Sequence, residues 1–185
     1  MKRCEWVSNN PIMIKYHDEE WGVPLYDDKK IFEFLVLDCF QAGLSWEIVI
    51  NKREAFRQAF SNFDPKEVSK YTDNNAKKLI NNPSIIRNKH KIEASITNAK
   101  KFLEIQKEFG SFSNYIWKFV NHKPIKNEYK NILELPNKTK EAELMSKELK
   151  KRGFKFVGPT ICYAFMQATG MVNDHTINCF RYEEV

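Results

Sequence analysis

The segment LKKRGFKFVGPTICYAFMQATG, residues 149–170, is the most informative stretch for the fold. Its pattern predicts two helices joined by a short turn with a glycine at each end, Gly153 and Gly158. Glycine permits a positive φ angle and lets another backbone come close. Pro159 opens the second helix, whose first N–H groups point outward and suit a phosphate. The pattern fits an ordinary helical hairpin with a solvated basic rim, or a hairpin that holds DNA by its backbone.

Helical signals also dominate the chain outside this segment. Residues 121–138 are polar and unperiodic and predict a long loop. No segment alternates between apolar and polar residues for more than a few positions, and no repeat or linker indicates separate domains. We therefore expect an all-α fold and one domain, residues 1–185. In the first half of the chain we expect one helix that starts at Pro11 after Asn10, one from Asp27 or Asp28 to near Gly43, one over Trp46–Phe60, one that starts at Pro65 and one from Thr72 to Ile80. In the second half we expect a long amphipathic helix that ends at Gly110, a short one from Ser111 or Ser113 to Val120, one over Thr139–Arg152 and one from Pro159 to Gly170.

Composition bounds the kind of protein without identifying it. Hydrophobic residues make up 42% of the chain, which is enough for a core. The longest apolar stretch, Ile31–Leu37, is far shorter than the ~20 residues that span a bilayer. No signal-like leader opens the chain, so we expect a soluble, cytoplasmic protein without a membrane partner. Lys and Arg number 30 against 24 Asp and Glu, giving +6, which permits a phosphate partner but is also typical of a compositional bias toward lysine.

Two Cys/His pairs lie at opposite ends of the chain. Cys4 and His17 are near the start, and His175 and Cys179 are near the end, four residues apart. On a helix, residues i and i+4 share one face and can grip one ion. Two thiolates and two imidazoles suit tetrahedral Zn²⁺ in a closed, structural site. Separated pairs also arise by coincidence, so spacing alone leaves both interpretations open.

Aromatic residues gather in the first 46 positions, where Trp6, Tyr16, Trp21 and Trp46 lie. Asp38 falls among apolar neighbours on a predicted helix, where burying a carboxylate is costly. Core packing explains large aromatic rings equally well. The functional alternative is a slot that sandwiches a planar base while Asp38 accepts hydrogen bonds from the edge of that base, as flipped-base pockets do.

Several longer strings complete this pattern and run in order along nearly the whole chain. Together they resemble the 3-methyladenine DNA glycosylase I family. The strings are RCEW at 3–6, YHDEEWGVP at 16–24, QAGLSW at 41–46, IIR at 85–87, WKFVN at 117–121, KKRGFKFVGPT at 150–160 and VNDH at 172–175.

The resemblance implies a helix-hairpin-helix glycosylase fold, with the hairpin at about 149–170. The glycine-bounded turn and its basic flank predict that Lys151, Gly153, Lys155 and Gly158 contact DNA phosphates. The resemblance implies one structural zinc that joins the termini through the four Cys/His residues. It also implies a base pocket formed by Tyr16, Trp46 and an acid at 38, with Trp6 and Trp21 nearby. The family pattern has glutamate at that position, so Asp38 reaches one methylene less far.

The resemblance further implies excision of 3-methyladenine from alkylated double-stranded DNA by a monomer. Methylation at N3 makes the adenine cationic and a good leaving group, so Asp38 need only recognise and stabilise it. No lysine is placed as a Schiff-base nucleophile, so we expect no strand cleavage, and we assign no catalytic role to Asp174. The alternatives are a zinc-stabilised DNA-binding protein without catalysis and a helical enzyme that acts on another substrate.

Overall fold

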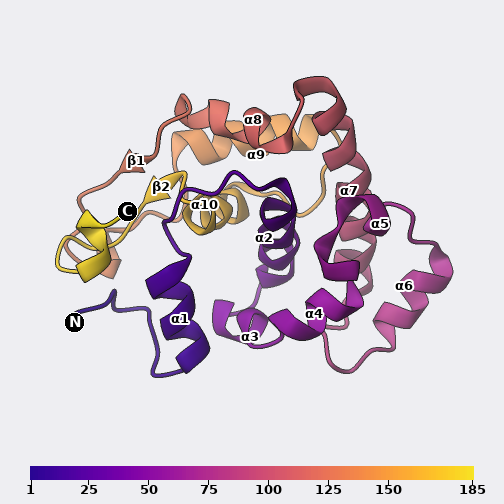
Figure 1. The fold of residues 1–185 in the computed structure, drawn as a ribbon, viewed down its shortest axis with the longest axis horizontal. Helices are drawn as coiled ribbons and strands as arrows, with labels where there is room; N and C mark the ends of the chain where they lie inside the picture. Colours follow the sequence, from indigo (N-terminus) through magenta and orange to yellow (C-terminus); the bar gives the residue numbers. More distant parts are fainter.

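The computed structural model describes residues 1–185, and helices make up most of it (Figure 1). The α-helices are α1 (Pro11–Glu19), α2 (Asp28–Gln41), α3 (Trp46–Ile50), α4 (Arg53–Ala59), α5 (Pro65–Val68), α6 (Asp73–Ile80), α7 (Lys89–Phe109), α8 (Phe112–Trp117), α9 (Lys140–Lys151) and α10 (Pro159–Ala168). Short 3₁₀ helices are η1 (Ser61–Phe63), η2 (Lys118–Val120), η3 (Ile132–Glu134) and η4 (Phe180–Glu183), and the two strands are β1 (Ile125–Lys126) and β2 (Val172–Asn173).

Helix α2 lies at the centre of the molecule (Figure 1). Every residue from Ile31 to Phe40 is buried, because α10, α7, α8 and α3 pack around the helix. The Asp27 side chain caps its start by accepting from the N–H of Lys30. Since neighbours cover α2 on all sides, Asp38 has no solvent-facing position available to it, and it is 1% exposed.

The two helices of the predicted hairpin are present as α9 and α10, which pack against each other. Asn98 clamps the turn between them by accepting from the N–H of Lys155 and donating to its carbonyl oxygen. Gly153 has φ +92°, whereas Gly158 has φ −65° and nothing within 4 Å of a Cβ added there. Positive φ is therefore required at Gly153, and Gly158 leaves open space beside its backbone.

Two local predictions are wrong. The expected helix Trp46–Phe60 is divided into α3 and α4, because Lys52 leaves helical geometry at φ −102° and ψ 4°. The side chain of Asn51, at this break, accepts from Asn10 Nδ2 at 2.8 Å. The expected loop 121–138 contains β1, which pairs in parallel with β2, and also η3. A two-residue strand carries no periodicity, so only its distant partner reveals it.

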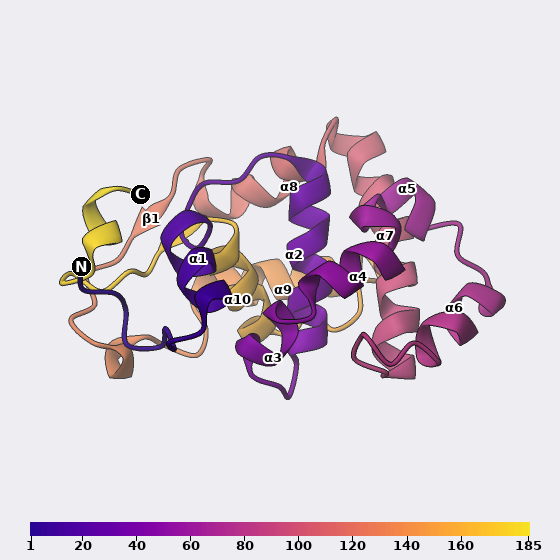
Figure 2. The same ribbon diagram turned by 60° about the horizontal axis from the view of Figure 1, so that its bottom comes forward.

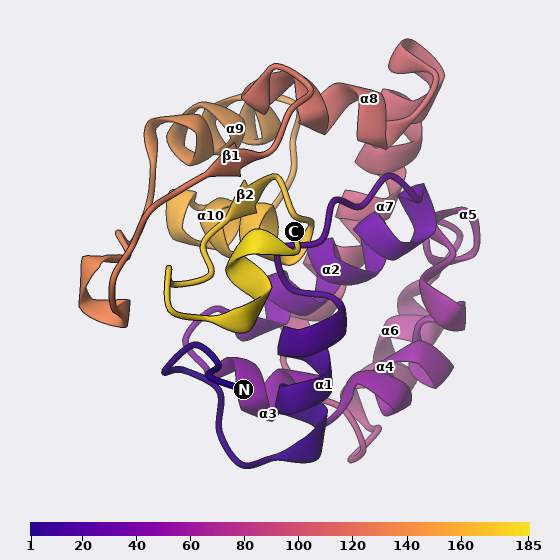
Figure 3. The same ribbon diagram turned by 60° about the vertical axis from the view of Figure 1, so that its left-hand side comes forward.

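The ends of the chain meet on one side of the molecule (Figures 2 and 3). The N–H of Phe180 donates to the carbonyl of Lys2 at 3.0 Å. Nearby, Gly170 ends the α10 segment at φ +65°, where an added Cβ would lie 2.2 Å from the carbonyl carbon of Val23. The N-terminal third is thus packed directly on the end of α10. No helix is long and apolar enough to cross a membrane.

Candidate base pocket, metal centre and nucleic-acid interface

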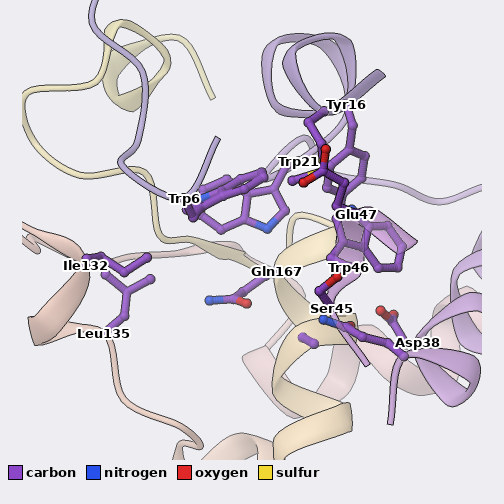
Figure 4. A pocket seen from close by; sticks show the side chains of 13 residues that line it. Trp6, Tyr16, Trp21, Asp38, Ser45, Trp46, Glu47, Ile132, Leu135 and Gln167 are labelled. Atoms are coloured by element: carbon purple, nitrogen blue, oxygen red, sulfur yellow. The ribbon is translucent and has the colours of Figure 1, made fainter. Parts of the chain in front are cut away.

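A cavity of about 380 Å³ opens between the N-terminal third and α10. All five residues expected at a base pocket line it, as Figure 4 shows for Trp6, Tyr16, Trp21, Asp38 and Trp46. Its other lining residues are Met13, Gln41, Ser45, Glu47, Ile132, Leu135, Ala164 and Gln167.

The aromatic rings form a continuous wall instead of two separated plates. The ring centroids of Tyr16 and Trp46 are 5.1 Å apart and those of Trp6 and Trp21 are 4.9 Å apart. A base between two rings needs a gap of about 7 Å, twice an ordinary carbon contact of ~3.5 Å. Neither pair leaves that gap, so a base cannot enter between Tyr16 and Trp46 or between Trp6 and Trp21.

Three polar atoms of this cavity are buried without a hydrogen-bond partner. They are Oδ2 of Asp38 and Nε1 of both Trp6 and Trp46. Buried polar groups are nearly always satisfied, because an unpaired one loses the free energy of its hydrogen bonds to water. One acceptor and two donors that line one cavity are therefore typical of a site that a polar, planar ligand completes.

Burial affects the protonation of the acid that lines the cavity. It raises the pKa of Asp38 well above its usual range, because no nearby cation compensates for lost hydration. Burial also raises the pKa of Tyr16 well above its usual range, and a charge on Asp38 would raise it further. Burial thus favours the neutral form of Asp38, whereas a positive charge in the cavity would favour the ionised form.

The four Cys/His residues from the two ends of the chain come together in one buried cluster. Their ligand atoms all lie within 4.8 Å of one another. Sγ of Cys179 lies 3.4 Å from Nε2 of His17 and 3.5 Å from Nδ1 of His175. Ligands of a tetrahedral zinc ion, at about 2.0–2.3 Å, are about 3.3–3.8 Å apart, so this donor set fits such an ion.

The hydrogen bonds around the cluster orient both imidazoles. His17 Nδ1 donates to Oδ1 of Asp18 at 2.7 Å, and His175 Nε2 donates to the carbonyl of Trp21 at 3.0 Å. The other nitrogen of each ring therefore presents a lone pair to the thiols. Burial lowers the pKa of His175 to about 4, which keeps it neutral, and raises that of Cys4 to about 12.

One step of the sequence argument for this cluster is wrong. His175 and Cys179 do not lie on a helix: they belong to a turn between β2 and η4. The N–H of Cys179 donates to the carbonyl of Thr176 at 2.7 Å, which bends the chain back on itself. The turn brings the two side chains together as a helix would.

The hairpin turn presents unpaired cations. Lys151 and Lys155 are exposed and take part in no ion pair, whereas the neighbouring Arg152 is held by Glu108 at 2.7 Å. Helix α10 begins with no side-chain cap on its first N–H groups. Unpaired lysines beside an uncapped helix start are suited to phosphate oxygens.

The chain matches the methyladenine glycosylase family over residues 6–182. The chain belongs to the methyladenine glycosylase family. It is 47% identical over 182 residues to DNA-3-methyladenine glycosylase 1 of Escherichia coli (strain K12), covering 98% of this chain and 97% of that protein. It is 48% identical over 177 residues to DNA-3-methyladenine glycosylase of Haemophilus influenzae, covering 96% of each.

Solved structures of this methyladenine glycosylase family have the same fold. A crystal structure of 3-methyladenine DNA glycosylase I superposes with a TM-score of 0.94 at 45% identity, covering 97% of this chain and 98% of that one. A structure of 3-methyladenine DNA glycosylase I from Staphylococcus aureus, which addresses 3-methyladenine recognition, has a TM-score of 0.93 at 36% identity and covers 97% and 96%.

In this member of the methyladenine glycosylase family, the candidate metal cluster borders the candidate base pocket. The ring of Trp6 lies 5.4 Å from that of His17, and the ring of Trp21 lies 4.6 Å from that of His175. Two of the four wall rings thus rest on candidate metal ligands.

Several residues that line the cavity were not predicted from the sequence, most notably Ala164 and Gln167 on α10 and Ile132 and Leu135 from the expected loop. A signal existed for Gln167, which is a polar residue within an otherwise apolar helix. Ala164 and Gln167 also share a face at i, i+3. Nothing in the pattern of the loop indicated that it closes one side of the pocket.

Proposed function

We propose that this chain hydrolyses the N-glycosidic bond of 3-methyladenine in alkylated double-stranded DNA, as a base-excision repair enzyme. The aromatic cavity with an unpartnered, buried acid supports the proposal most directly. Close relatives named for this activity support it independently. One connected cluster of buried side chains runs from Cys4 to Cys179, which supports treating residues 1–185 as one domain.

Asp38 is the residue that distinguishes the damaged base. The flipped nucleotide stacks on the wall formed by Tyr16 and Trp46, with Trp6 and Trp21 beside it. Its positive charge favours the ionised form of Asp38, which neutral adenine cannot do. The exocyclic amino group of adenine can donate to the freed Oδ2. An undamaged base is uncharged, so it would bind beside a neutral, poorly hydrated acid and would gain less binding free energy.

Asp38 then contributes to catalysis by stabilising the cationic base and the positive charge that develops on the sugar. Because the lesion already carries a positive charge, no group must protonate the leaving base. No lysine lines the cavity, which supports a monofunctional enzyme that leaves the DNA strand uncut.

Two further features serve binding and stability. We infer that the buried cluster of Cys4, His17, His175 and Cys179 holds one structural Zn²⁺, since no ligand position would stay open for water. We also infer that the turn acts as a helix-hairpin-helix element, in which Lys151, Gly153, Lys155 and Gly158 contact phosphates without reading sequence. A monomer suffices, because the pocket and the turn belong to one chain.

The test is release of free base from methylated duplex DNA. The protein should release 3-methyladenine and leave abasic sites in uncut strands, which alkali then cleaves. Unmethylated DNA of the same sequence is the control. Binding to the duplex without release of any base would instead favour a DNA-binding protein without catalysis, and would refute the proposal.

A further inference from the structure

A polar network lies behind the cavity wall, centred on Asp174. This residue is 1% exposed, and its carboxylate accepts three side-chain hydrogen bonds. Tyr163 Oη donates to Oδ2 at 2.5 Å and Gln167 Nε2 donates to the same oxygen at 2.7 Å. Asn127 Nδ2 donates to Oδ1 at 2.7 Å. The carboxylate therefore ties α10 to the segment that follows β1.

The network fixes which end of the Gln167 amide faces the cavity. A carboxylate can only accept, so the amide must turn Nε2 toward Asp174. Its Oε1 then remains free, and no protein group donates to it. Gln167 is half-buried and lines the cavity (Figure 4). The cavity thus presents a second acceptor, held in a set orientation, in addition to Asp38.

The two acceptors lie at different depths. Asp38 is 1% exposed and marks the inner end of the cavity, whereas Gln167 is only half-buried. Figure 4 shows Gln167 below the Trp6 and Trp21 rings, with Ile132 and Leu135 on one side of it and Asp38 on the other. A base that reaches Asp38 keeps its sugar toward the exposed side, because the sugar stays joined to the DNA outside. Of the two acceptors, the half-buried Gln167 is the one suited to the sugar side of a bound base.

We propose that Gln167 orients the water that attacks C1′ of the damaged nucleotide, and that Asp174 is the positioning residue that holds the Gln167 amide. This proposal rests on the proposed function. The water oxygen forms a bond to C1′ while the C1′–N9 bond breaks, and that electron pair stays on the base. The cationic lesion leaves as neutral 3-methyladenine, and the surplus proton of the water passes to solvent.

Gln167 does not take that proton. Its Oε1 accepts a hydrogen bond from the water and so directs an oxygen lone pair toward C1′, which reduces the orientational freedom lost in the transition state. Reversing the amide would present N–H to the water and would no longer accept its hydrogen. The value of Asp174 is that it disfavours the reversed amide.

The first test is Gln167→Met, which keeps the length of the side chain and removes the acceptor. We expect the single-turnover rate of 3-methyladenine release to fall about tenfold, as for one lost hydrogen bond in the transition state. Affinity for free 3-methyladenine should stay within about twofold. Gln106→Met is the matched control, because Gln106 Nε2 also donates to a carboxylate, that of Asp28, away from the cavity.

Two results would overturn the water-orienting role: an unchanged rate, or a parallel loss of affinity for the free base, which would make Gln167 a recognition residue. Wild-type protein that releases no base would instead refute the proposed function, so the two failures are distinguishable. Gln167→Met decides the question alone if a change at Asp174 prevents folding.

The second test is Asp174→Asn, measured with and without Gln167→Met. An asparagine can donate to Oε1 and so lets the Gln167 amide reverse. We expect the rate to fall when Gln167 is present and not to fall further when methionine is there. An equal loss in both backgrounds would show that Asp174 acts through the fold and would refute its positioning role. Metal content and melting temperature are measured alongside, because His175 is adjacent.

Discussion

The metal cluster and the base pocket share a wall but treat their buried polar groups in opposite ways. In the cluster, each candidate ligand atom lies 3.4–3.5 Å from another candidate ligand atom. The remaining ring nitrogens of the two histidines donate to Asp18 and to the carbonyl of Trp21. In the pocket, Asp38 Oδ2 and the Nε1 atoms of Trp6 and Trp46 have no partner.

This difference separates a site that is closed by its own residues from one that awaits a ligand. A closed cluster contributes to stability once filled, and its loss is felt by the whole fold. An open pocket holds unsatisfied groups whose hydrogen bonds form only with the substrate, so it contributes to function and costs stability. The contrast predicts that substitutions at the two sites affect different measurements.

The largest expected effect is on stability, from breaking the closed site. Cys179→Ser should abolish binding of one zinc per chain and lower the melting temperature by roughly 10 °C or more. Losing a structural metal costs at least several kcal/mol, and a chain of this size loses about 2–4 °C per kcal/mol. Metal analysis and thermal unfolding measure this.

Cys39→Ala is the control for that substitution, because Cys39 is equally buried and lies outside the cluster. It should keep the metal. If Cys179→Ser retains both its metal and its melting temperature, the cluster is not a metal centre.

The next effect is on function, from changing the open site. Asp38→Asn keeps the shape and removes the charge, so a charge-assisted hydrogen bond worth ~1.5–3 kcal/mol is lost. Affinity for 3-methyladenine, and the rate of its release from methylated DNA, should fall about tenfold or more. The melting temperature should not fall, because the carboxyl has no partner to lose. Wild-type affinity and activity in a folded Asp38→Asn variant would remove Asp38 from the recognition site.

Asp38→Glu sharpens this result. It restores the side-chain length of the family pattern, and Oδ2 faces a cavity of about 380 Å³ with no partner in the way. We therefore expect the variant to fold and to keep its rate of base release within a few-fold of wild type. Destabilisation with loss of activity would show that the pocket has closed around the shorter acid.

A smaller effect is a pH dependence of stability that arises at the open site. In the unfolded chain, Asp38 loses its proton near pH ~4, whereas burial holds its folded pKa well above that range. The folded state binds more protons between the two pKa values, so the free energy of unfolding falls as pH rises through this window. Asp38→Asn removes this decrease in the free energy of unfolding, because asparagine does not titrate.

Thermal unfolding of both proteins across this window checks the sign. As pH rises above ~4, the melting temperature of Asp38→Asn should increase relative to that of the wild type. A difference that stays constant with pH would contradict the raised pKa. The metal cluster is the same in both proteins, so its own pH dependence cancels in the comparison.

The smallest effects are expected at the basic turn, which lies outside both sites. Lys151→Ala and Lys155→Ala should each weaken duplex binding for all sequences. Each should also lower the slope of log affinity against log salt by about one unit. Lys70→Ala is the control, because Lys70 is exposed and already paired with Glu67 at 2.8 Å. Unchanged salt dependence would identify the turn as a solvated rim without a DNA contact.

What the sequence by itself determined is largely local. Caps at Asn10 and Asp27, with the prolines after Asn10 and Gly158, predicted where α1, α2 and α10 begin, because the capping side chain bonds within a few residues. The strings shared with the glycosylase family indicated the candidate pocket and metal residues, because they combine rare residue types in a fixed order.

Only the tertiary structure decided how distant segments complete one another. It broke the helix at Asn51, paired β1 with β2, and placed His175 and Cys179 in a turn. The break at Asn51 and the pairing of β1 involve partners far along the chain, which no local pattern encodes. The same holds for Asp38 and Gln167: their residue types are visible in the sequence, but which of their oxygens stays unpartnered depends on the packing of α2 and α10.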